Sequence, residues 1–298
     1  LRGAWMICDI LEFRKTLPML CLILQAVLLA CGAARADSPP FTTHLLAIGV
    51  CPPWKQQSAS VCRKGVETIA EGLTKRLAIA PENHHLLVNA DATTEGLKKE
   101  MAALASQLGP RDRLIIYANV HSGALDRTRP AGPENDVIVL WSEEKPEVLA
   151  FGVAEGTLIT ASDFAAMVHK LPAGEVVVLF NACESGAITP LFLQNHPDDD
   201  PSRPEAVVTS AKSDQLANFA ADGSIALFTE QFGLSLQSAE GELKDAVMHA
   251  AAATEKAAIQ ICGKMASEVE KLGLPANACD QQPTIHDPDG ILAHMKLE

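Results

Sequence analysis

The sequence predicts an α/β fold in which a mostly parallel sheet is covered by helices on both faces. Short apolar runs alternate along the chain with longer segments whose apolar residues recur at helical spacing. The apolar runs are continuous instead of alternating with polar residues, which is typical of strands buried on both faces of a parallel sheet. Such sheets bind ligands at the carboxyl ends of their strands.

The first half of the chain supplies the first strands and helices of this pattern. Each strand is an apolar run, and Gly109-Pro110 ends the second helix. We expect strands at 44–50, 85–89 and 114–120, and helices at 63–77 and from an N-cap at Thr93 or Thr94 to Leu108.

The second half continues the alternation after a polar stretch, rich in Pro and Gly, from Ser122 to Asn135. Short strands at 136–141 and 156–160 are expected to form a hairpin-like excursion. The remaining expected elements are strands at 175–180 and 205–210, and helices from Ser162 to Pro172, at 225–236 and within 243–272. We expect the Pro-containing tail after Gly273 to be irregular.

Residues 1–36 have the organisation of a secretory signal peptide. Arg14 and Lys15 precede a nearly continuous apolar run, and Ala34-Arg35-Ala36 is a small-x-small cleavage signature. A lipoprotein anchor at Cys31 is the second choice, because the Leu at position 29 is bulky for that motif. No later apolar run is long enough to span a bilayer. The mature chain is therefore expected to be exported, either periplasmic or secreted.

Composition and charge exclude some partners. Hydrophobic residues make up 48% of the chain and charged residues 20%, as in ordinary globular proteins. Residues 1–36 contain four basic and two acidic side chains, so their removal takes the formal charge from −13 to −15. So acidic a body is a poor nucleic-acid binder, because phosphate contacts need a basic face.

Five of the eight cysteines lie after the predicted signal peptide. Cys51 and Cys62 are 11 positions apart, and Cys262 and Cys279 are 17 apart. In an oxidising compartment both pairs could close as disulfides over short loops. Cys183 is left over, and such a cysteine is either a buried, inert thiol or a reactive one.

His121 and Cys183 each follow a predicted core strand, and each has a Gly within three residues. A lone His or Cys in such a place is more often structural. Their coincidence at two strand ends favours chemistry, because an imidazole can take the proton of a thiol and later protonate a departing amine. Backbone N–H groups in Gly-containing turns could stabilise an oxyanion.

No group of His, Cys and carboxylate residues has the spacing of a zinc or calcium site. The sequence therefore predicts no metal and no cofactor. It carries no signal for an oligomeric state.

Two strings resemble the catalytic blocks of the cysteine peptidases that include caspases, metacaspases and legumains (clan CD). They are LIIYANVH at 114–121 and VVVLFNACESG at 176–186, of which ACESG is similar to legumains. The segment 81–114 looks more like bacterial caspase-like proteins, and 207–215 resembles both groups. The resemblance spans roughly Leu45 to Leu236. It implies a caspase-like three-layer sandwich, with a peptidase domain at 37–237 and a helical extension at 238–298 packed on it.

The resemblance also implies roles for individual residues. His121 would be the general acid–base and Cys183 the nucleophile. The oxyanion donors would be the backbone N–H groups of Cys183 and of the residue after His121. Family members usually have Gly there, whereas this chain has Ser122, followed by Gly123.

For substrate binding, the resemblance points to four residues: Asn181, Ser210, Asp214 and Arg63. Metacaspases have Asp, and legumains Glu, at the position of Asn181. Asp214 matches a second acidic position of a pocket for basic side chains, or is an exposed loop residue. Arg63 falls near a pocket Arg of caspases and legumains, or is a solvated charge on the first helix. An S1 pocket for Arg, Lys or Asn is expected more than one for Asp.

The expected function is that of an exported cysteine endopeptidase, which hydrolyses peptide or protein substrates through a thioester acyl-enzyme. Two alternatives stay open: a non-catalytic caspase-like binding or regulatory module, and a transpeptidase that uses the same dyad. An unrelated α/β hydrolase is disfavoured, because the chain has no G-x-S-x-G motif.

Overall fold

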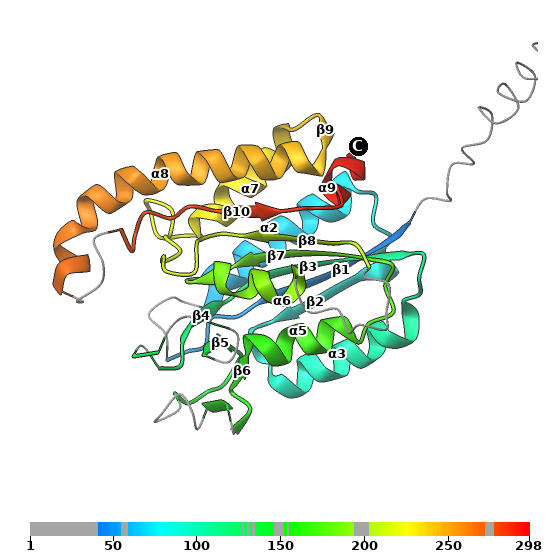
Figure 1. Cartoon of the computed structure of the whole chain (residues 1–298), viewed down its shortest axis with the longest axis horizontal. Helices are drawn as coiled ribbons and strands as arrows, with labels where there is room; N and C mark the ends of the chain where they lie inside the picture. Colours follow the sequence, from blue (N-terminus) through cyan, green and yellow to red (C-terminus); the bar gives the residue numbers. More distant parts are fainter. Residues whose placement is uncertain are drawn as a thin grey trace, which may run out of the picture. The chain divides into compact units, whose positions relative to one another are not determined.

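A six-stranded sheet forms the middle layer of the protein, with strand order β10-β8-β7-β3-β1-β2 (Figure 1). This computed structural model describes residues 41–54, 59–126, 128–129, 132, 135–145, 152–153, 155–193, 203–271 and 277–298. The strands are β1 (Thr42–Gly49), β2 (His84–Val88), β3 (Asp112–Asn119), β7 (Glu175–Asn181), β8 (Glu205–Thr209) and β10 (Thr284–His286). Every pairing in this sheet is parallel except that of β10 with β8. The predicted α/β fold with a mostly parallel sheet is therefore confirmed.

The continuous apolar runs have a simple cause, because successive side chains of a strand point to opposite faces. On β1, Leu46 and Ile48 pack into one hydrophobic core, while Leu45 and Ala47 pack into the other. All four are almost completely buried. Both faces of the sheet are thus covered, as the sequence predicts.

Helices form the two outer layers (Figure 1). One face is covered by α2 (Ala59–Arg76), α7 (Leu227–Ser238), α8 (Leu243–Lys271) and α9 (Ile291–His294). The other is covered by α3 (Thr94–Gln107), α5 (Ala161–His169) and α6 (Thr189–Leu193). Short 3-10 helices, η1 (Pro81–Asn83) and η2 (Asn89–Asp91), flank β2. Thr93 is the N-cap of α3, where its hydroxyl accepts a hydrogen bond from the Gly96 N–H at 3.0 Å.

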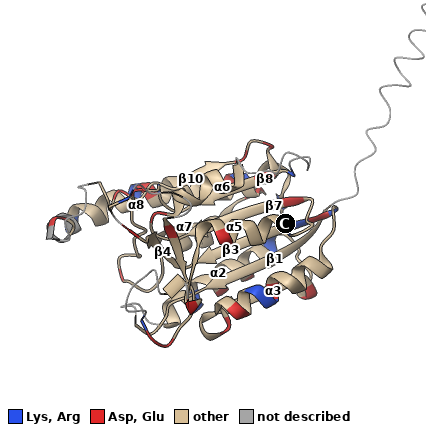
Figure 2. Ribbon diagram, turned by 60° about the horizontal axis from the view of Figure 1, so that its bottom comes forward, with Lys and Arg blue, Asp and Glu red and all other residues tan. Residues whose placement is uncertain are grey.

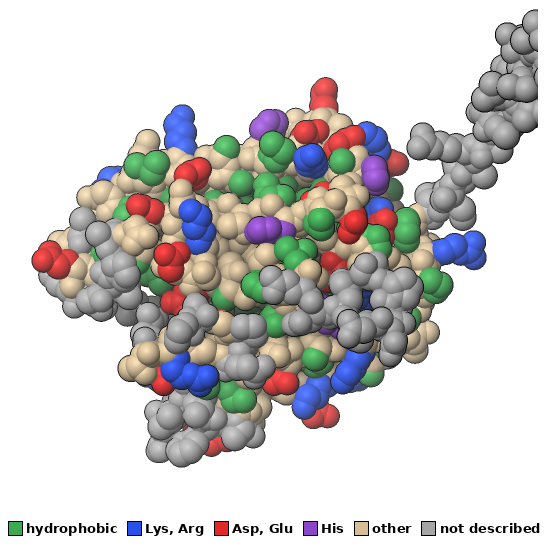
Figure 3. All heavy atoms as spheres, viewed as in Figure 1, with side chains coloured by type: hydrophobic (Ala, Val, Ile, Leu, Met, Phe, Trp, Pro, Cys, Tyr) green, Lys and Arg blue, Asp and Glu red, His purple; other side chains and the backbone are tan. Residues whose placement is uncertain are grey.

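Charged residues lie mainly on the outer elements. Figure 2 shows Lys, Arg, Asp and Glu on α3 and α8, whereas most of the sheet carries other residues. On the face seen in Figure 3, cationic side chains are interspersed with anionic ones. No helix within the described ranges is long and apolar enough to cross a membrane.

A second, antiparallel sheet shows that the turn predicted after the strand at 114–120 is wrong. Its strands are β4 (His121–Ala124), β5 (Asp136–Val139) and β6 (Leu158–Thr160), in the order β4-β5-β6. His121-Ser122-Gly123 was expected to form a tight turn, but His121 pairs with Val139 and Gly123 with Val137. The turn prediction is wrong because the half-buried β4 has no apolar run of its own, and its extended form comes from pairing with the apolar β5.

The prediction for the tail after Gly273 is also wrong. It was expected to be irregular, but it contains β10, α9 and β11 (Lys296–Leu297), which pairs with β9 (Gly241–Glu242). β10 has three residues of mixed polarity, so its pattern gives no strand signal. It is a strand because its backbone extends the edge of β8, where the hydroxyls of Thr209 and Thr284 lie 2.7 Å apart.

The predicted signal peptide at 1–36, with the alternative anchor at Cys31, lies outside the described residues.

Candidate active site

His121 and Cys183 reach one place because their strands are neighbours. β3 and β7 pair in parallel, with Asn119 opposite Asn181, and His121 and Cys183 each follow two residues later. Both line one cavity of about 30 Å³ at the carboxyl ends of the strands. Its other lining residues are Val61, Cys62, Asn119, Val120, Asn181, Ala182, Ala217, Asn218, Phe219 and Ala226.

Cys183 is half-buried and keeps its thiol. The Ala217 N–H donates a hydrogen bond to Cys183 Sγ at 3.4 Å. The thiol in turn donates to the Ala217 carbonyl at 4.0 Å, so both backbone polar groups of Ala217 contact the sulfur.

The chain turns sharply directly after the thiol. Glu184 has a left-handed backbone, with φ 55°, and its N–H donates to the Gln215 carbonyl at 2.7 Å. The 3-10 helix η3 (Ser185–Ile188) follows. A Cβ on Gly186 would lie 2.7 Å from the backbone N of Ser213, so only glycine allows η3 to lie this close to the next loop.

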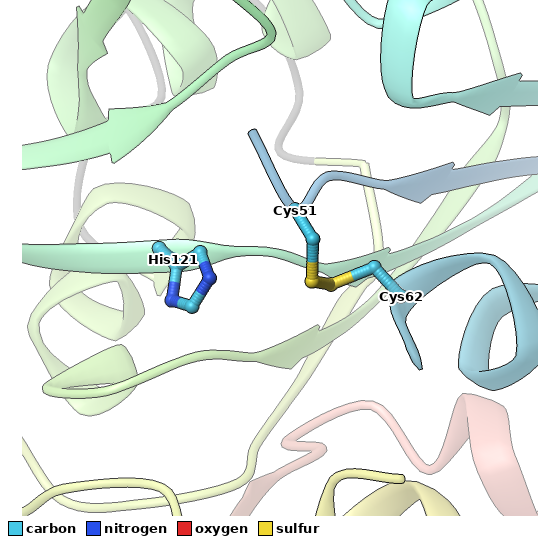
Figure 4. Close-up of side chains that lie close together, drawn as sticks. All are labelled: Cys51, Cys62 and His121. Atoms are coloured by element: carbon cyan, nitrogen blue, oxygen red, sulfur yellow. A yellow bond between two sulfur atoms is a disulfide. The ribbon is translucent and has the colours of Figure 1, made fainter. Parts of the chain in front are cut away.

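The His121 ring lies beside a disulfide. Cys51 and Cys62 are bonded to each other, with their Cα atoms 5.6 Å apart. A ring nitrogen of His121 and the two sulfurs all lie within 4.8 Å of one another (Figure 4). Cys51 follows β1 and Cys62 lies in α2, so the disulfide fixes the start of α2 next to the imidazole.

The second predicted pair is also a disulfide. Cys262 of α8 is bonded to Cys279, and their Cα atoms are 5.3 Å apart. Each disulfide lies close to another potential metal ligand, His121 in the first case and Asp280 in the second. Disulfide sulfurs are not thiolates, so neither group among the described residues offers the ligand set of a zinc site.

Asn119 and Asn181 form the floor of the cavity, and buried polar side chains of the core lie behind them. The Asn181 Nδ2 donates to Asn119 Oδ1 at 3.0 Å and to Thr229 Oγ1 of α7 at 2.8 Å. The Tyr117 hydroxyl lies 2.6 Å from Thr229 Oγ1, and burial raises the pKa of Tyr117, so this phenol is neutral. A Cβ on Gly65 would lie 2.5 Å from Asn119 Nδ2, so glycine lets α2 pack directly on this floor.

Sequence reasoning missed Tyr117, Asn119 and Thr229. One signal was available for Asn119, because it and Asn181 end the apolar runs of two strands at matching positions. Thr229 lies within a helical pattern and gave no signal.

Residues 217–219 form another side of the cavity, and the segment 278–282 holds the loop that contains them. The Leu216 N–H donates to the Ala278 carbonyl at 2.6 Å. Asn218 donates twice, from its N–H to Gln281 Oε1 at 2.7 Å and from its Nδ2 to the Cys279 carbonyl at 2.9 Å. Gln281 is completely buried, and its Nε2 donates to the Ser210 carbonyl at 2.9 Å. No pattern in the sequence predicts this support.

The predicted oxyanion residues lie on β4, which is tied to the turn at Cys183. The Ser122 hydroxyl donates to the Cys183 carbonyl. The Ala124 N–H donates to Glu184 Oε2 at 2.9 Å, and a Cβ on Gly123 would lie 3.7 Å from that same oxygen. Ser122 and Gly123 therefore run alongside the segment that carries the thiol.

The four predicted substrate-binding residues lie in different places. Asn181 belongs to the cavity lining, whereas Ser210, Asp214 and Arg63 lie outside it. The Ser210 hydroxyl is buried, and it accepts a hydrogen bond from the Ala182 N–H at 3.1 Å. Asp214 is exposed. Arg63 is exposed and forms an ion pair with Glu67 at 3.2 Å on the surface of α2.

Comparisons with known proteins give information on the fold. No protein-family model and no curated protein sequence matches the chain. The chain is similar to the crystal structure of protein GSU0716 from Geobacter sulfurreducens, with a TM-score of 0.55 and 15% identity over 86% of this chain and 97% of that chain. It is also similar to caspase-1 from Spodoptera frugiperda, with a TM-score of 0.46 and 10% identity over 85% and 92%. The first likeness shows the fold alone, and the second has too low a TM-score to carry an argument.

Proposed function

We propose that this protein is an exported cysteine endopeptidase of the caspase–legumain type, with Cys183 as nucleophile and His121 as general acid–base. The observation that supports this proposal is the cavity that both residues line, at the carboxyl ends of adjacent parallel strands. That edge is where parallel sheets bind ligands. We place the peptidase domain at 37–237 and its helical extension at 238–298.

The proposed reaction has two steps. In the first, His121 takes the proton of the Cys183 thiol, and the sulfur attacks the carbonyl carbon of the scissile peptide bond. The C–N bond breaks, His121 gives the proton to the departing amine, and a thioester remains. In the second, His121 takes a proton from water, the hydroxide attacks the thioester, and the C–S bond breaks. The acid leaves, and the proton returns to sulfur.

The oxyanion of each step needs fixed N–H donors. We assign this role to the backbone N–H groups of Cys183 and of Ser122 or Gly123. The hydrogen bond from the Ser122 hydroxyl to the Cys183 carbonyl supports this assignment, because it holds the two segments together. The variant Ser122→Gly keeps the backbone N–H of position 122 but removes the hydrogen bond from the hydroxyl to the Cys183 carbonyl.

Export is the second part of the proposal. The two disulfides, Cys51–Cys62 and Cys262–Cys279, are consistent with an oxidising compartment. Cleavage after Ala36 predicts that the exported protein begins at Asp37. N-terminal sequencing of the protein from the periplasm or the medium tests this, and a lipid-modified Cys31 would support the alternative anchor.

The catalytic proposal is tested with the mature chain and a mixed peptide library. We expect Cys183→Ala and His121→Ala each to lower kcat/KM by at least about a thousandfold, and the double variant to be little worse, because the two residues act as a unit. Glu82→Ala is the matched control, because this exposed residue of η1 lies before the amino end of β2 and outside the cavity lining.

The outcomes separate the open alternatives. Equal hydrolysis by the wild type and Cys183→Ala would overturn the peptidase proposal. No hydrolysis, together with no labelling of Cys183 by a thiol-reactive peptide probe, would favour a non-catalytic binding module. New peptide bonds formed with an added amine would identify a transpeptidase.

A further inference from the structure

We infer that the substrate residue on the carbonyl side of the scissile bond, P1, has a small, uncharged side chain such as that of Ala or Ser. This inference rests on the proposed function. It differs from the expectation of an Arg, Lys or Asn pocket, and it depends on the size and chemistry of the cavity beside Cys183.

The position of the cavity makes it the P1 pocket. When the P1 carbonyl carbon lies against Cys183 Sγ, the P1 side chain branches one bond away and must enter the nearest hollow. The cavity is lined by both His121 and Cys183 and by the strand residues directly before them, Val120 and Ala182. It is therefore the hollow that a P1 side chain meets first.

The volume of the cavity limits the side chain. About 30 Å³ accommodates roughly two water-sized groups. A Cβ with one further heavy atom fits, which describes Ser, and Ala fits with room left over. Lys and Arg extend several heavy atoms beyond Cβ and do not fit. Asn, with three heavy atoms beyond Cβ, exceeds the space as well.

The chemistry of the lining limits the charge. Within the part of the chain that the structure describes, the lining contains no Lys, Arg, Asp or Glu. A charged P1 side chain would therefore lose its hydration without gaining an opposite charge. The two charged residues expected to serve it, Asp214 and Arg63, lie outside the lining.

The floor adds a further restriction. Asn181 is 2% exposed, and its Oδ1 accepts no hydrogen bond from the described residues. The two Nδ2 hydrogens of Asn181 are already donated to Asn119 and Thr229, so this residue offers no donor to a P1 carboxylate, which is unfavourable for Asp.

The test measures kcat/KM for a peptide series that differs only at P1: Gly, Ala, Ser, Asn, Leu, Asp, Lys and Arg. We expect Ala and Ser to be cleaved at least tenfold better than Asn, Leu and the charged residues. A preference for a charged or large residue that still depends on Cys183 would overturn this inference and leave the proposed function intact. No Cys183-dependent cleavage of any peptide would overturn both.

Enlarging the cavity provides a matched test. Phe219→Ala removes a ring from the lining, so cleavage after Asn or Leu should rise at least tenfold relative to cleavage after Ala. Val61→Ala shortens another lining side chain and should act in the same direction. Leu234→Ala is the control, because Leu234 is an exposed apolar residue of α7 outside the lining, and its P1 preference should equal that of the wild type. An unchanged preference in both cavity variants would contradict the assignment of the pocket.

Discussion

Two walls of the cavity are held in place differently. The α2 wall, Val61 and Cys62, contains a disulfide, because Cys62 is bonded to Cys51. The loop wall, Ala217, Asn218 and Phe219, depends on hydrogen bonds from Asn218 to Gln281 and Cys279. The Cys262–Cys279 disulfide is outside the lining, and it includes the residue whose carbonyl accepts from Asn218. The α2 wall is thus fixed covalently next to His121, whereas the loop wall is positioned by polar contacts with a distant segment.

Removing each disulfide in turn gives the largest expected effects on this comparison. Cys51→Ala/Cys62→Ala and Cys262→Ala/Cys279→Ala should each lower the free energy of unfolding by about 2–4 kcal/mol. The closed loops, 11 and 17 residues, differ in closure entropy by only about 0.4 kcal/mol, so the two losses should be similar.

The two disulfide variants should differ in peptide hydrolysis, although their losses of stability should be similar. The first variant alters the surroundings of His121 directly, so its kcat/KM should fall at least tenfold further than that of the second. Denaturant titration and peptide hydrolysis, both at a temperature where each variant is folded, provide the two measurements. Equal losses of activity would show that the α2 wall has no special relation to the imidazole.

The loop wall can be weakened without touching a cysteine. Gln281→Ala leaves the buried Asn218 N–H and Ser210 carbonyl without this partner, which should lower the free energy of unfolding by about 2–3 kcal/mol. If the proposed function holds, KM should rise more than kcat falls, because this wall would contact substrate without carrying the reacting groups. Gln237→Ala, on the exposed side of α7, is the control and should change neither quantity. An unchanged KM in Gln281→Ala would separate the loop wall from substrate binding.

The hydrogen bonds behind the floor of the cavity can be tested by removing one hydroxyl, that of Tyr117. Tyr117→Phe removes the contact with Thr229 but keeps the ring in the core, so we expect a loss of about 1 kcal/mol in stability. Thr229 retains its hydrogen bond from Asn181, and the P1 preference should therefore stay as in the wild type. Ser238→Ala removes an exposed hydroxyl of α7 for comparison, with an expected change within about 0.5 kcal/mol. A shifted P1 preference in Tyr117→Phe would show that the contact between Tyr117 and Thr229 is needed to position Asn181.

Asp136, on β5, belongs to neither wall and gives the smallest expected effect. Burial, and then the neighbouring charge of Glu184, raise the pKa of the Asp136 carboxyl, whereas the hydrogen bond from the Gly132 N–H opposes them. A raised pKa means that the folded state binds the proton more tightly, so this group favours folding more as pH falls through its folded pKa. Asp136→Asn should therefore gain stability relative to the wild type at pH 7, and the gain should vanish near pH 3.

Asp222 is a matched carboxyl for which the expected change in stability has the opposite sign. Hydrogen bonds from Ser224 lower the pKa of the exposed Asp222, so Asp222→Asn should lose relative stability at pH 7 compared with pH 3. Denaturation midpoints at the two pH values measure both differences. The same sign for both variants would contradict the pKa directions.

The sequence predicted the parts of the site that belong to the sheet. His121 and Cys183 follow long apolar runs, and such runs reveal buried strands whatever their partners are. The order of the strands brings β3 next to β7, and parallel pairing then brings both residues to the same edge. The local disulfides were also visible, since each closes a short loop.

The parts that the sequence did not reveal depend on contacts between distant segments. β10 is a strand only because β8 offers an edge, and Gln281 is buried only because Asn218 and Ser210 lie against it. Neither has an apolar pattern of its own. The environment of Asp214 was equally inaccessible, because motif position does not show whether a side chain lines a cavity or faces solvent.

The nearness of the Cys51–Cys62 disulfide to His121 sets a condition on how the protein must be handled. The proposed chemistry needs the Cys183 sulfur reduced, whereas the α2 wall needs the sulfurs of Cys51 and Cys62 oxidised to a disulfide. Cys183 and Cys62 line the same cavity. A reductant added to protect the nucleophile therefore also attacks the wall. Activity should pass through a maximum as the concentration of dithiol rises, and the descending side should be smaller in Cys51→Ala/Cys62→Ala, where the Cys262–Cys279 disulfide is left to be reduced.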